Sequence, residues 1–172
     1  MGILKFGESL LIICTIFCSV NAQSIAYDVI SISQANILGI ALGTSETELF
    51  SKLGEPDSVR ASFDPIVDED TTKTYYYKQS ELVTQLGEVK EIAIKSEAYP
   101  LSYQEIKVGN SLDDIKNIFP KSYSHIDGSE GSSRKVMTIF IGDLEKNITY
   151  DEEVQLLFVN GTLKQIAIWA PL

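Results

Sequence analysis

Cysteine is nearly absent from this chain of 172 residues. Its two cysteines, Cys14 and Cys18, lie close together in a short apolar run near the N-terminus. A lipoprotein signal has a small residue before its cysteine, whereas Ile13 and Phe17 stand there in this chain, so lipidation is not expected. If the run is removed on export, no disulfide can form. The remaining roughly 150 residues must then be stabilised by one sizeable hydrophobic core.

Basic residues are also scarce. The chain has 14 Lys and Arg against 24 Asp and Glu, which gives a formal net charge of −10 at pH 7. Such a surface repels phosphate backbones and anionic lipid, so we expect no nucleic-acid partner and no electrostatic binding to membranes. A basic protein or peptide, or a cation, remains electrostatically permitted.

Long apolar runs are missing too, because spanning a bilayer takes about 20 apolar residues. The N-terminal run, residues 10–18, is shorter, follows Lys5 and is succeeded by Val-Asn-Ala at residues 20–22. Small residues at these positions are what a signal peptidase reads. We therefore predict a signal peptide over residues 1–22, cleavage after Ala22, and export to the periplasm or the medium without membrane insertion of the mature protein. The alternative is an uncleaved anchor.

The familiar signatures of enzymes are lacking as well. The sequence contains no Walker loop, dinucleotide fingerprint or zinc signature. His125 is the single histidine, and it cannot build a multi-histidine metal site. Together with Asp127 it could assist a serine, but no glycine-flanked serine marks a nucleophile. We expect no cofactor and no metal.

Two stretches of the chain read as copies of one unit. Residues 40–45 (Ile-Ala-Leu-Gly-Thr-Ser) align with residues 106–111 (Ile-Lys-Val-Gly-Asn-Ser), and residues 89–94 (Val-Lys-Glu-Ile-Ala-Ile) align with residues 163–168 (Leu-Lys-Gln-Ile-Ala-Ile). The pattern of residues 24–33 does not decide between an edge strand and a helix. The predicted organisation is a signal peptide (1–22), an N-terminal segment (23–36), a first unit (37–95), a linker (96–105) and a second unit (106–172).

Each unit is predicted to begin with a short helix. Ser45 and Glu48 have the spacing of a capping box, and Ser111 and Asp114 repeat it. Both helices carry an apolar stripe, and helices this short must be held by packing on a sheet. The predicted ends of the two helices are Gly54 and Pro120.

Four strands are expected to follow each helix. Asn160-Gly161 is a strong hairpin signal, and Gly87-Glu88 occupies the corresponding place in the first unit. We predict an α+β fold in which two helix-plus-four-stranded antiparallel meanders form one sheet with the helices on one face. The predicted strands are residues 58–63, 73–79, 82–86, 89–95, 122–126, 134–142, 154–159 and 163–169. The predicted equivalent core pairs are Leu49/Ile115, Leu53/Phe119, Ile92/Ile166 and Ile94/Ile168.

Three consecutive tyrosines mark one predicted strand of the first unit. Tyr75 and Tyr77 point to one face of the sheet and Tyr76 to the other, so one set belongs to the core and the other is free to contact a partner. If the face of Tyr75 and Tyr77 is the open one, these side chains are the predicted binding residues, together with Asp64 and Asp68 on the preceding loop. The alternative is a face covered by a helix or by the linker.

Acidic residues crowd two short segments, residues 64–70 and 151–153. Calcium sites use carboxylates of this kind, but these segments lack the ordered alternation and the turn glycine of a calcium loop. We interpret both as solvated.

The helix signatures at residues 43–56 and 109–120, with the terminal hairpin at residues 154–169, resemble a known fold. The chain resembles the secreted β-lactamase-inhibitor-protein fold, which duplicates a helix-plus-meander unit. It is also similar to the SmpA/OmlA small lipoproteins of the outer-membrane β-barrel assembly machinery, which have one such unit. The resemblance implies a sheet whose concave face or hairpin loops bind another protein. The disulfides of the first family and the lipidated cysteine of the second have no counterpart here.

We therefore expect an exported, non-enzymatic module that binds another protein, either inhibitor-like or an accessory of envelope assembly. The identity of the partner and the oligomeric state do not follow from the sequence. One alternative is a small secreted hydrolase that uses His125 or the acidic loop. A second is a structural component of the envelope.

Overall fold

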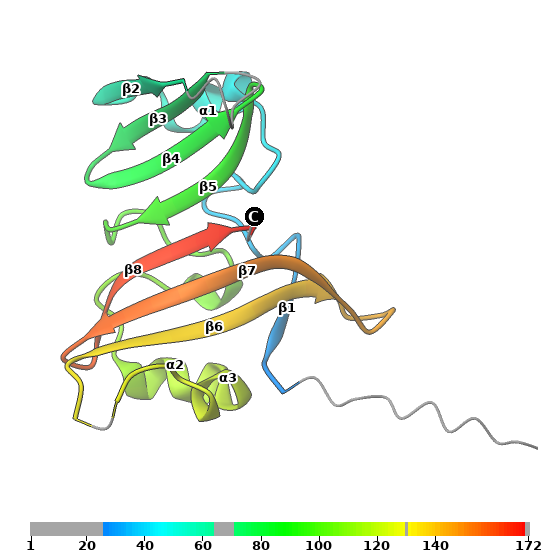
Figure 1. The fold of residues 1–172 in the computed structure, drawn as a ribbon, viewed down its shortest axis with the longest axis vertical. Helices are drawn as coiled ribbons and strands as arrows, with labels where there is room; N and C mark the ends of the chain where they lie inside the picture. The colour runs from blue at the N-terminus through cyan, green and yellow to red at the C-terminus, as the bar shows by residue number, and fades with distance from the viewer. Residues whose placement is uncertain (1–25, 64–70, 130, 171–172) are drawn as a thin grey trace, which may run out of the picture.

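The structure is a computed structural model that describes residues 26–63, 71–129 and 131–170. The predicted signal peptide and the predicted binding residues Asp64 and Asp68 lie outside these ranges. The described chain forms one eight-stranded sheet in the order β1-β6-β7-β8-β5-β4-β3-β2, with a few short helices (Figure 1). The prediction of an α+β protein with one sheet is confirmed.

All neighbouring strands are antiparallel except β1 and β6, which are parallel. The strands are β1 Val29–Ser31, β2 Ser58–Ser62, β3 Thr72–Tyr77, β4 Ser80–Gln85, β5 Glu88–Ile94, β6 Arg134–Asp143, β7 Ile148–Val159 and β8 Thr162–Trp169. The helices are α1 Glu46–Leu53, α2 Leu112–Ile118, α3 Pro120–Ser124 and a 3-10 turn at Tyr103–Glu105.

Both predicted helix starts are capped by their serines. The Ser45 hydroxyl accepts a hydrogen bond from the Glu48 N–H at 3.2 Å, and the Ser111 hydroxyl accepts one from the Asp114 N–H at 3.1 Å. These bonds satisfy N–H groups that have no partner within the helix, and they place the start of α1 and α2 where the sequence predicted it.

The stretches predicted as units, residues 37–95 and 106–172, are called here the first half and the second half. In each half, the segment before the first helix is hydrogen-bonded to the last strand. The Gly43 N–H donates to the Val89 carbonyl at 2.8 Å, and the Gly109 N–H donates to the Leu163 carbonyl at 2.9 Å. Gly43 and Gly109 both have positive φ, which glycine adopts without strain. Each helix is therefore tied at its start to the strand that closes its half.

The predicted strand at residues 122–126 is wrong, because α3 occupies most of this segment. Pro120 ends α2, as expected, but it is also the first residue of α3, where a proline loses no helical hydrogen bond and has a suitable φ. The second half therefore has two helices and a three-stranded meander. The first half has the predicted helix and four strands.

The N-terminal segment, which the sequence left undecided, forms the edge strand β1 beside β6. Asp28 anchors it to α3: the Asp28 N–H donates to the Ser122 hydroxyl at 3.0 Å, and the Ser122 N–H donates to the Asp28 carboxylate at 2.9 Å. Ser122 is fully buried, so this reciprocal pair satisfies polar groups that water cannot reach.

Two hairpin turns use the same backbone conformation. Asn160 and Gly161 both have positive φ, as the hairpin signal predicted. The turn between β4 and β5 lies at Leu86 and Gly87, one residue earlier than expected, and both of these residues have positive φ as well. The sequence could not reveal this register, because leucine is an unfavourable residue in that conformation.

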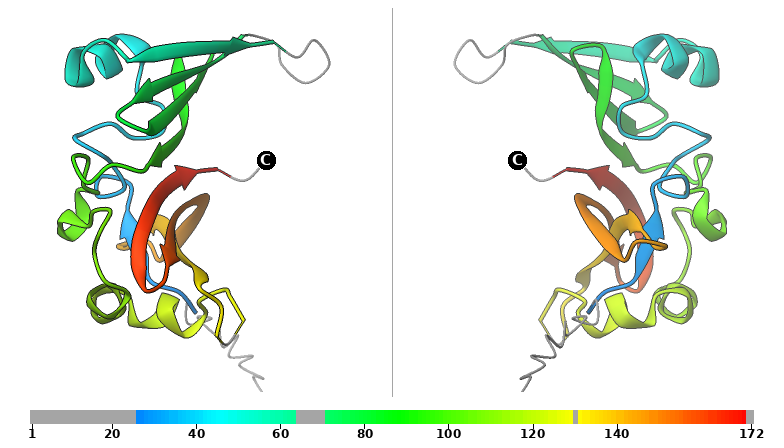
Figure 2. Two further views of the ribbon diagram at one scale, coloured as in Figure 1. Left: turned by 90° about the vertical axis from the view of Figure 1, so that its left-hand side faces the viewer. Right: turned by 90° about the vertical axis from the view of Figure 1, so that its right-hand side faces the viewer.

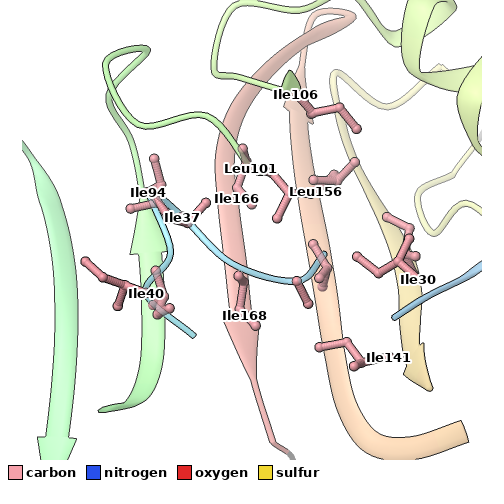
Figure 3. Close-up of a cluster of buried hydrophobic side chains, with 14 of the residues drawn as sticks. Ile30, Ile37, Ile40, Ile94, Leu101, Ile106, Ile141, Leu156, Ile166 and Ile168 are labelled. Carbon is pink, nitrogen blue, oxygen red and sulfur yellow. The ribbon is translucent and has the colours of Figure 1, made fainter. Parts of the chain in front are cut away.

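The core lies on one face of the sheet, beneath the helices and the connecting segments (Figure 2). Figure 3 shows side chains from two of these segments, including Ile37, Ile40 and Leu101, packed against side chains of the central strands. Of the predicted core pairs, all members are buried except Leu53, which is half-buried. Within the described residues no helix lies on the opposite face, around which the sheet curves (Figure 2).

Candidate functional site

The opposite side of the sheet, called here the helix-free face, is defined by the side chains that alternate with the core residues. Ile92 and Ile168 are paired and buried, so Ala93 and Trp169, their neighbours along the chain, point the other way. In an antiparallel sheet, directly paired residues share a face, which allows the helix-free face to be followed from strand to strand.

One row of paired residues crosses this face over all eight strands. Its centre lies at Trp169, the only tryptophan of the chain, which pairs with Glu91 on one side and with Glu153 on the other. We call these residues the central row. From the β2 edge to the β1 edge they are Arg60, Thr74, Val83, Glu91, Trp169, Glu153, Phe140 and Val29.

The middle of the face beside the central row is built from small side chains. Ala93 pairs with Ala167. Tyr76 and Glu81 lie further along this second row, toward the β2 edge. Large side chains thus flank two alanines at the middle of the sheet.

This face carries charges of both signs, with Arg60 and Lys95 beside Glu81, Glu91 and Glu153. Lys95 forms an ion pair with Glu81 at 2.5 Å. Glu153 accepts a hydrogen bond from the Gln155 amide at 2.7 Å. In the part of the chain that the structure describes, no lysine or arginine forms an ion pair with Glu91 or Glu153, the two carboxylates beside Trp169. An aromatic ring between two such carboxylates suits a cationic group.

The predicted binding residues Tyr75 and Tyr77 lie on the covered face. They are 4% and 3% exposed, the Tyr75 ring meets Phe50 of α1 edge-on at 5.2 Å, and the Tyr77 hydroxyl donates to the Gly54 carbonyl at 3.1 Å. Burial raises the pKa of Tyr77 to about 12. Contact between these rings and a partner would require α1 to move. The tyrosine of β3 on the helix-free face is the half-buried Tyr76.

A partly buried polar cluster, which the sequence did not indicate, joins α1 to the sheet. One carboxylate oxygen of Glu46 accepts from the Thr84 hydroxyl at 2.7 Å, and the Lys73 ammonium donates to both oxygens at 3.1 and 3.2 Å. Burial raises the pKa of Glu46, but the hydrogen bonds from Thr84 and Lys73 outweigh it and hold this pKa below its usual value. The bond to Glu46 in turn raises the pKa of Lys73.

The second half has apolar residues in the places of Glu46 and Thr84, whereas Lys135 pairs with Phe158 as Lys73 pairs with Thr84. Leu112 follows the helix cap Ser111 as Glu46 follows Ser45, and Phe158 pairs with Leu163 as Thr84 pairs with Val89. The fold therefore does not require a carboxylate at this position. In the first half it fixes the start of α1 to the sheet.

His125 is exposed and caps the C-terminal end of α3. Its ring lies 4.8 Å from the ring of Tyr27, which in turn meets Phe140 edge-on at 5.1 Å. The structure thus shows the histidine in an aromatic cluster at the β1 edge, which is consistent with a packing role.

A solvent-open pocket of about 130 Å³ lies where the N-terminal segment crosses the ends of the central strands. Glu152 is its single ionisable lining residue. The other residues that line it are Ile32, Ala35, Ala41, Leu42, Ile141 and Ile168.

The β6–β7 hairpin extends beyond this pocket, because β7 begins at Ile148 rather than at the predicted residue 154. Figure 1 shows the end of this hairpin projecting past β1. Leu144, Ile148 and Tyr150 on it are exposed. The corresponding turn of the first half, at Lys78 and Gln79, is only two residues long.

Comparison with known proteins gives two weak structural likenesses. No protein-family model and no curated protein sequence matches the chain. It is similar to an extracellular protein from Bacillus anthracis str. Ames that contains an SCP domain, with a TM-score of 0.48 and 13% identity over 75% of this chain and 44% of that one. It therefore spans less than half the length of that protein.

A second similar structure is that of a candidate β-lactamase inhibitor protein from Streptococcus mutans. The TM-score is 0.31, with 17% identity over 72% of this chain and 81% of that one. The TM-scores of the two structures indicate a weak likeness of fold.

Within the described residues, no helix has the length and apolar character needed to cross a membrane.

Proposed function

We propose that the protein is an exported, non-enzymatic module that binds another protein through the helix-free face of its sheet. The observation that carries this proposal is the central row, in which Val83, Trp169 and Phe140 alternate with Glu91 and Glu153 on a face without a helix. Protein interfaces are enriched in tryptophan and other aromatic residues, which supply contact area at a low entropic cost.

The size of the face is adequate for such an interface. Strands lie about 4.8 Å apart, so eight of them span roughly 34 Å. A standard interface buries about 800 Å² on each partner, which corresponds to a patch roughly 28 Å across. The curvature of the sheet around this side also favours a convex partner (Figure 2).

The proposal also includes a signal peptide and a tandem repeat. Residues 1–22 direct the chain to the periplasm or the medium, as the sequence predicts. The two halves are tandem units, residues 37–95 and 106–172, related by a twofold axis near the centre of the sheet. The equivalent bonds of Gly43 and Gly109 to the last strand of each half support this relation.

The test is capture of a partner by the exported protein from an extract of the cell envelope and medium of its host. We expect Trp169→Ala and Tyr76→Ala to reduce capture strongly, because both remove contact area from the helix-free face. Leu38→Ala is the matched control, since Leu38 is 47% exposed but lies on a connecting loop. All variants are first compared with the wild type for their free energy of unfolding.

Equal capture by all variants would contradict the proposed binding face. Loss of a measured hydrolytic turnover on His125→Ala would favour the hydrolase alternative instead.

A further inference from the structure

The environment of Trp169 indicates which chemistry the helix-free face recognises. Glu91 on β5 and Glu153 on β7 are its direct partners, so a glutamate lies on each side of Trp169 along the central row. Directly paired residues on one face of an antiparallel sheet have their Cβ atoms about 4.5–5.5 Å apart. Both carboxylates are therefore within reach of a group that rests on the indole.

These carboxylates lie beside a large apolar ring without a compensating cation in the described chain. Glu91 is exposed and Glu153 is half-buried, and the whole chain has a net charge of −10. Two like charges on either side of an indole, on strands about 10 Å apart, raise the free energy of the unbound face. A cation from outside would lower it.

The other half of the sheet provides an internal comparison. The repeat aligns Gln165 with Glu91 and Lys95 with Trp169. In that half the corresponding position therefore carries a neutral amide, and its cation is already paired with Glu81. The carboxylate–indole–carboxylate arrangement is thus specific to one place on the face, and the fold does not impose it.

We propose that Trp169, Glu91 and Glu153 bind an arginine side chain of the partner protein. The guanidinium stacks on the indole, while its N–H groups donate to the two carboxylates. Arginine fits better than lysine because its planar, weakly hydrated cation stacks on aromatic rings and donates in several directions at once. This inference rests on the proposed function, since it names the partner group that the helix-free face recognises.

The probe is an acetylated and amidated hexa-arginine peptide, and the readout is the single indole N–H signal in a nitrogen-15 NMR spectrum of the full exported protein. We expect a saturable shift of that signal, a weaker shift with hexa-lysine, and none with the neutral hexa-citrulline peptide. The double substitution Glu91→Gln and Glu153→Gln should weaken arginine binding at least tenfold.

The matched control is Glu97→Gln with Glu105→Gln, which removes the same charge from exposed positions on the linker. It should change the affinity less than twofold. Equal weakening by both double variants would show general charge attraction, and an unshifted indole or equal binding of hexa-citrulline would likewise overturn the inference. Trp169→Phe, followed by calorimetry, should retain weaker binding because an aromatic ring remains.

Failure of this inference can be distinguished from failure of the proposed function. If hexa-arginine leaves the indole unshifted while Trp169→Ala still abolishes partner capture, the face binds a partner through other chemistry. If hexa-arginine binds as expected while partner capture is unaffected by Trp169→Ala and Tyr76→Ala, the arginine site stands and the proposed binding face does not.

Discussion

Ala93 on β5 and Ala167 on β8 are directly paired at the centre of the sheet, and the sequence repeat aligns these same two alanines with each other. Their neighbours Ile92 and Ile168 are paired on the core face. If the two stretches are copies of one unit, a residue that lies opposite its own counterpart is close to a twofold axis. The register of the central strand pair is therefore what a twofold relation of the two halves requires.

If the halves are equivalent, the same truncation should have a similar effect in each. Ile92→Ala and Ile166→Ala should each lower the free energy of unfolding by about 2–5 kcal/mol, because both side chains are fully buried and the substitutions leave cavities. Urea denaturation measures this change. Lys164→Ala, at an exposed position on β8, should stay within about 0.5 kcal/mol. An unchanged urea midpoint for Ile166→Ala would be incompatible with its place in the core.

A substitution at Leu86, in the turn between β4 and β5, should raise the stability of the protein. Leu86 has a φ of 54° and is 65% exposed, so it has a strained backbone and little packing to compensate. Leu86→Asn should stabilise the protein by about 1 kcal/mol, since asparagine tolerates this conformation. The reverse change at the corresponding position, Asn160→Leu, should destabilise it by a similar amount. Opposite signs are expected in thermal or urea unfolding, and a loss of stability with Leu86→Asn would refute the strain.

Glu46 should make stability depend on pH. Its pKa is held below the usual value of about 4.5 in the folded state, so its contribution is present above that pH and is lost as the pH falls through the lower, folded-state pKa. Glu46→Gln should cost about 1–3 kcal/mol at pH 7, because Thr84 and Lys73 lose a charged acceptor. The gap between wild type and variant should narrow toward pH 3. A gap that is constant between pH 7 and pH 3 would rule out this linkage.

The N-terminal strand should depend on one carboxylate. Asp28→Ala leaves the N–H of the fully buried Ser122 without its acceptor, which should cost about 1–3 kcal/mol. Amide exchange of residues 29–31 should become faster, since Asp28 anchors β1 to α3. Asp28→Asn keeps an acceptor oxygen and should lose less. Equal exchange rates in wild type and Asp28→Ala would mean that β1 is held by its pairing with β6 alone.

Local interactions explain most of what the sequence by itself determined. The caps at Ser45 and Ser111 need only residues within one helical turn, and the Asn160–Gly161 turn needs only two residues that accept positive φ. The alternation of apolar residues along β5 and β8 was equally visible. These signals were sufficient for the α+β class, for seven of the eight strands and for most of the core.

Tertiary structure decided what local chemistry leaves open. Ser122, in the helix at residues 120–124, is buried against Asp28, a residue far away in the chain that local patterns do not reveal. Side chains alternate between the two faces of a sheet along a strand, so Tyr75 and Tyr77 lie on one face and Tyr76 on the other. Only the packing of α1 determines which of these faces is covered. Trp169 meets Glu91 and Glu153 through the register of three strands, and such pairing depends on long-range contacts that no segment specifies alone.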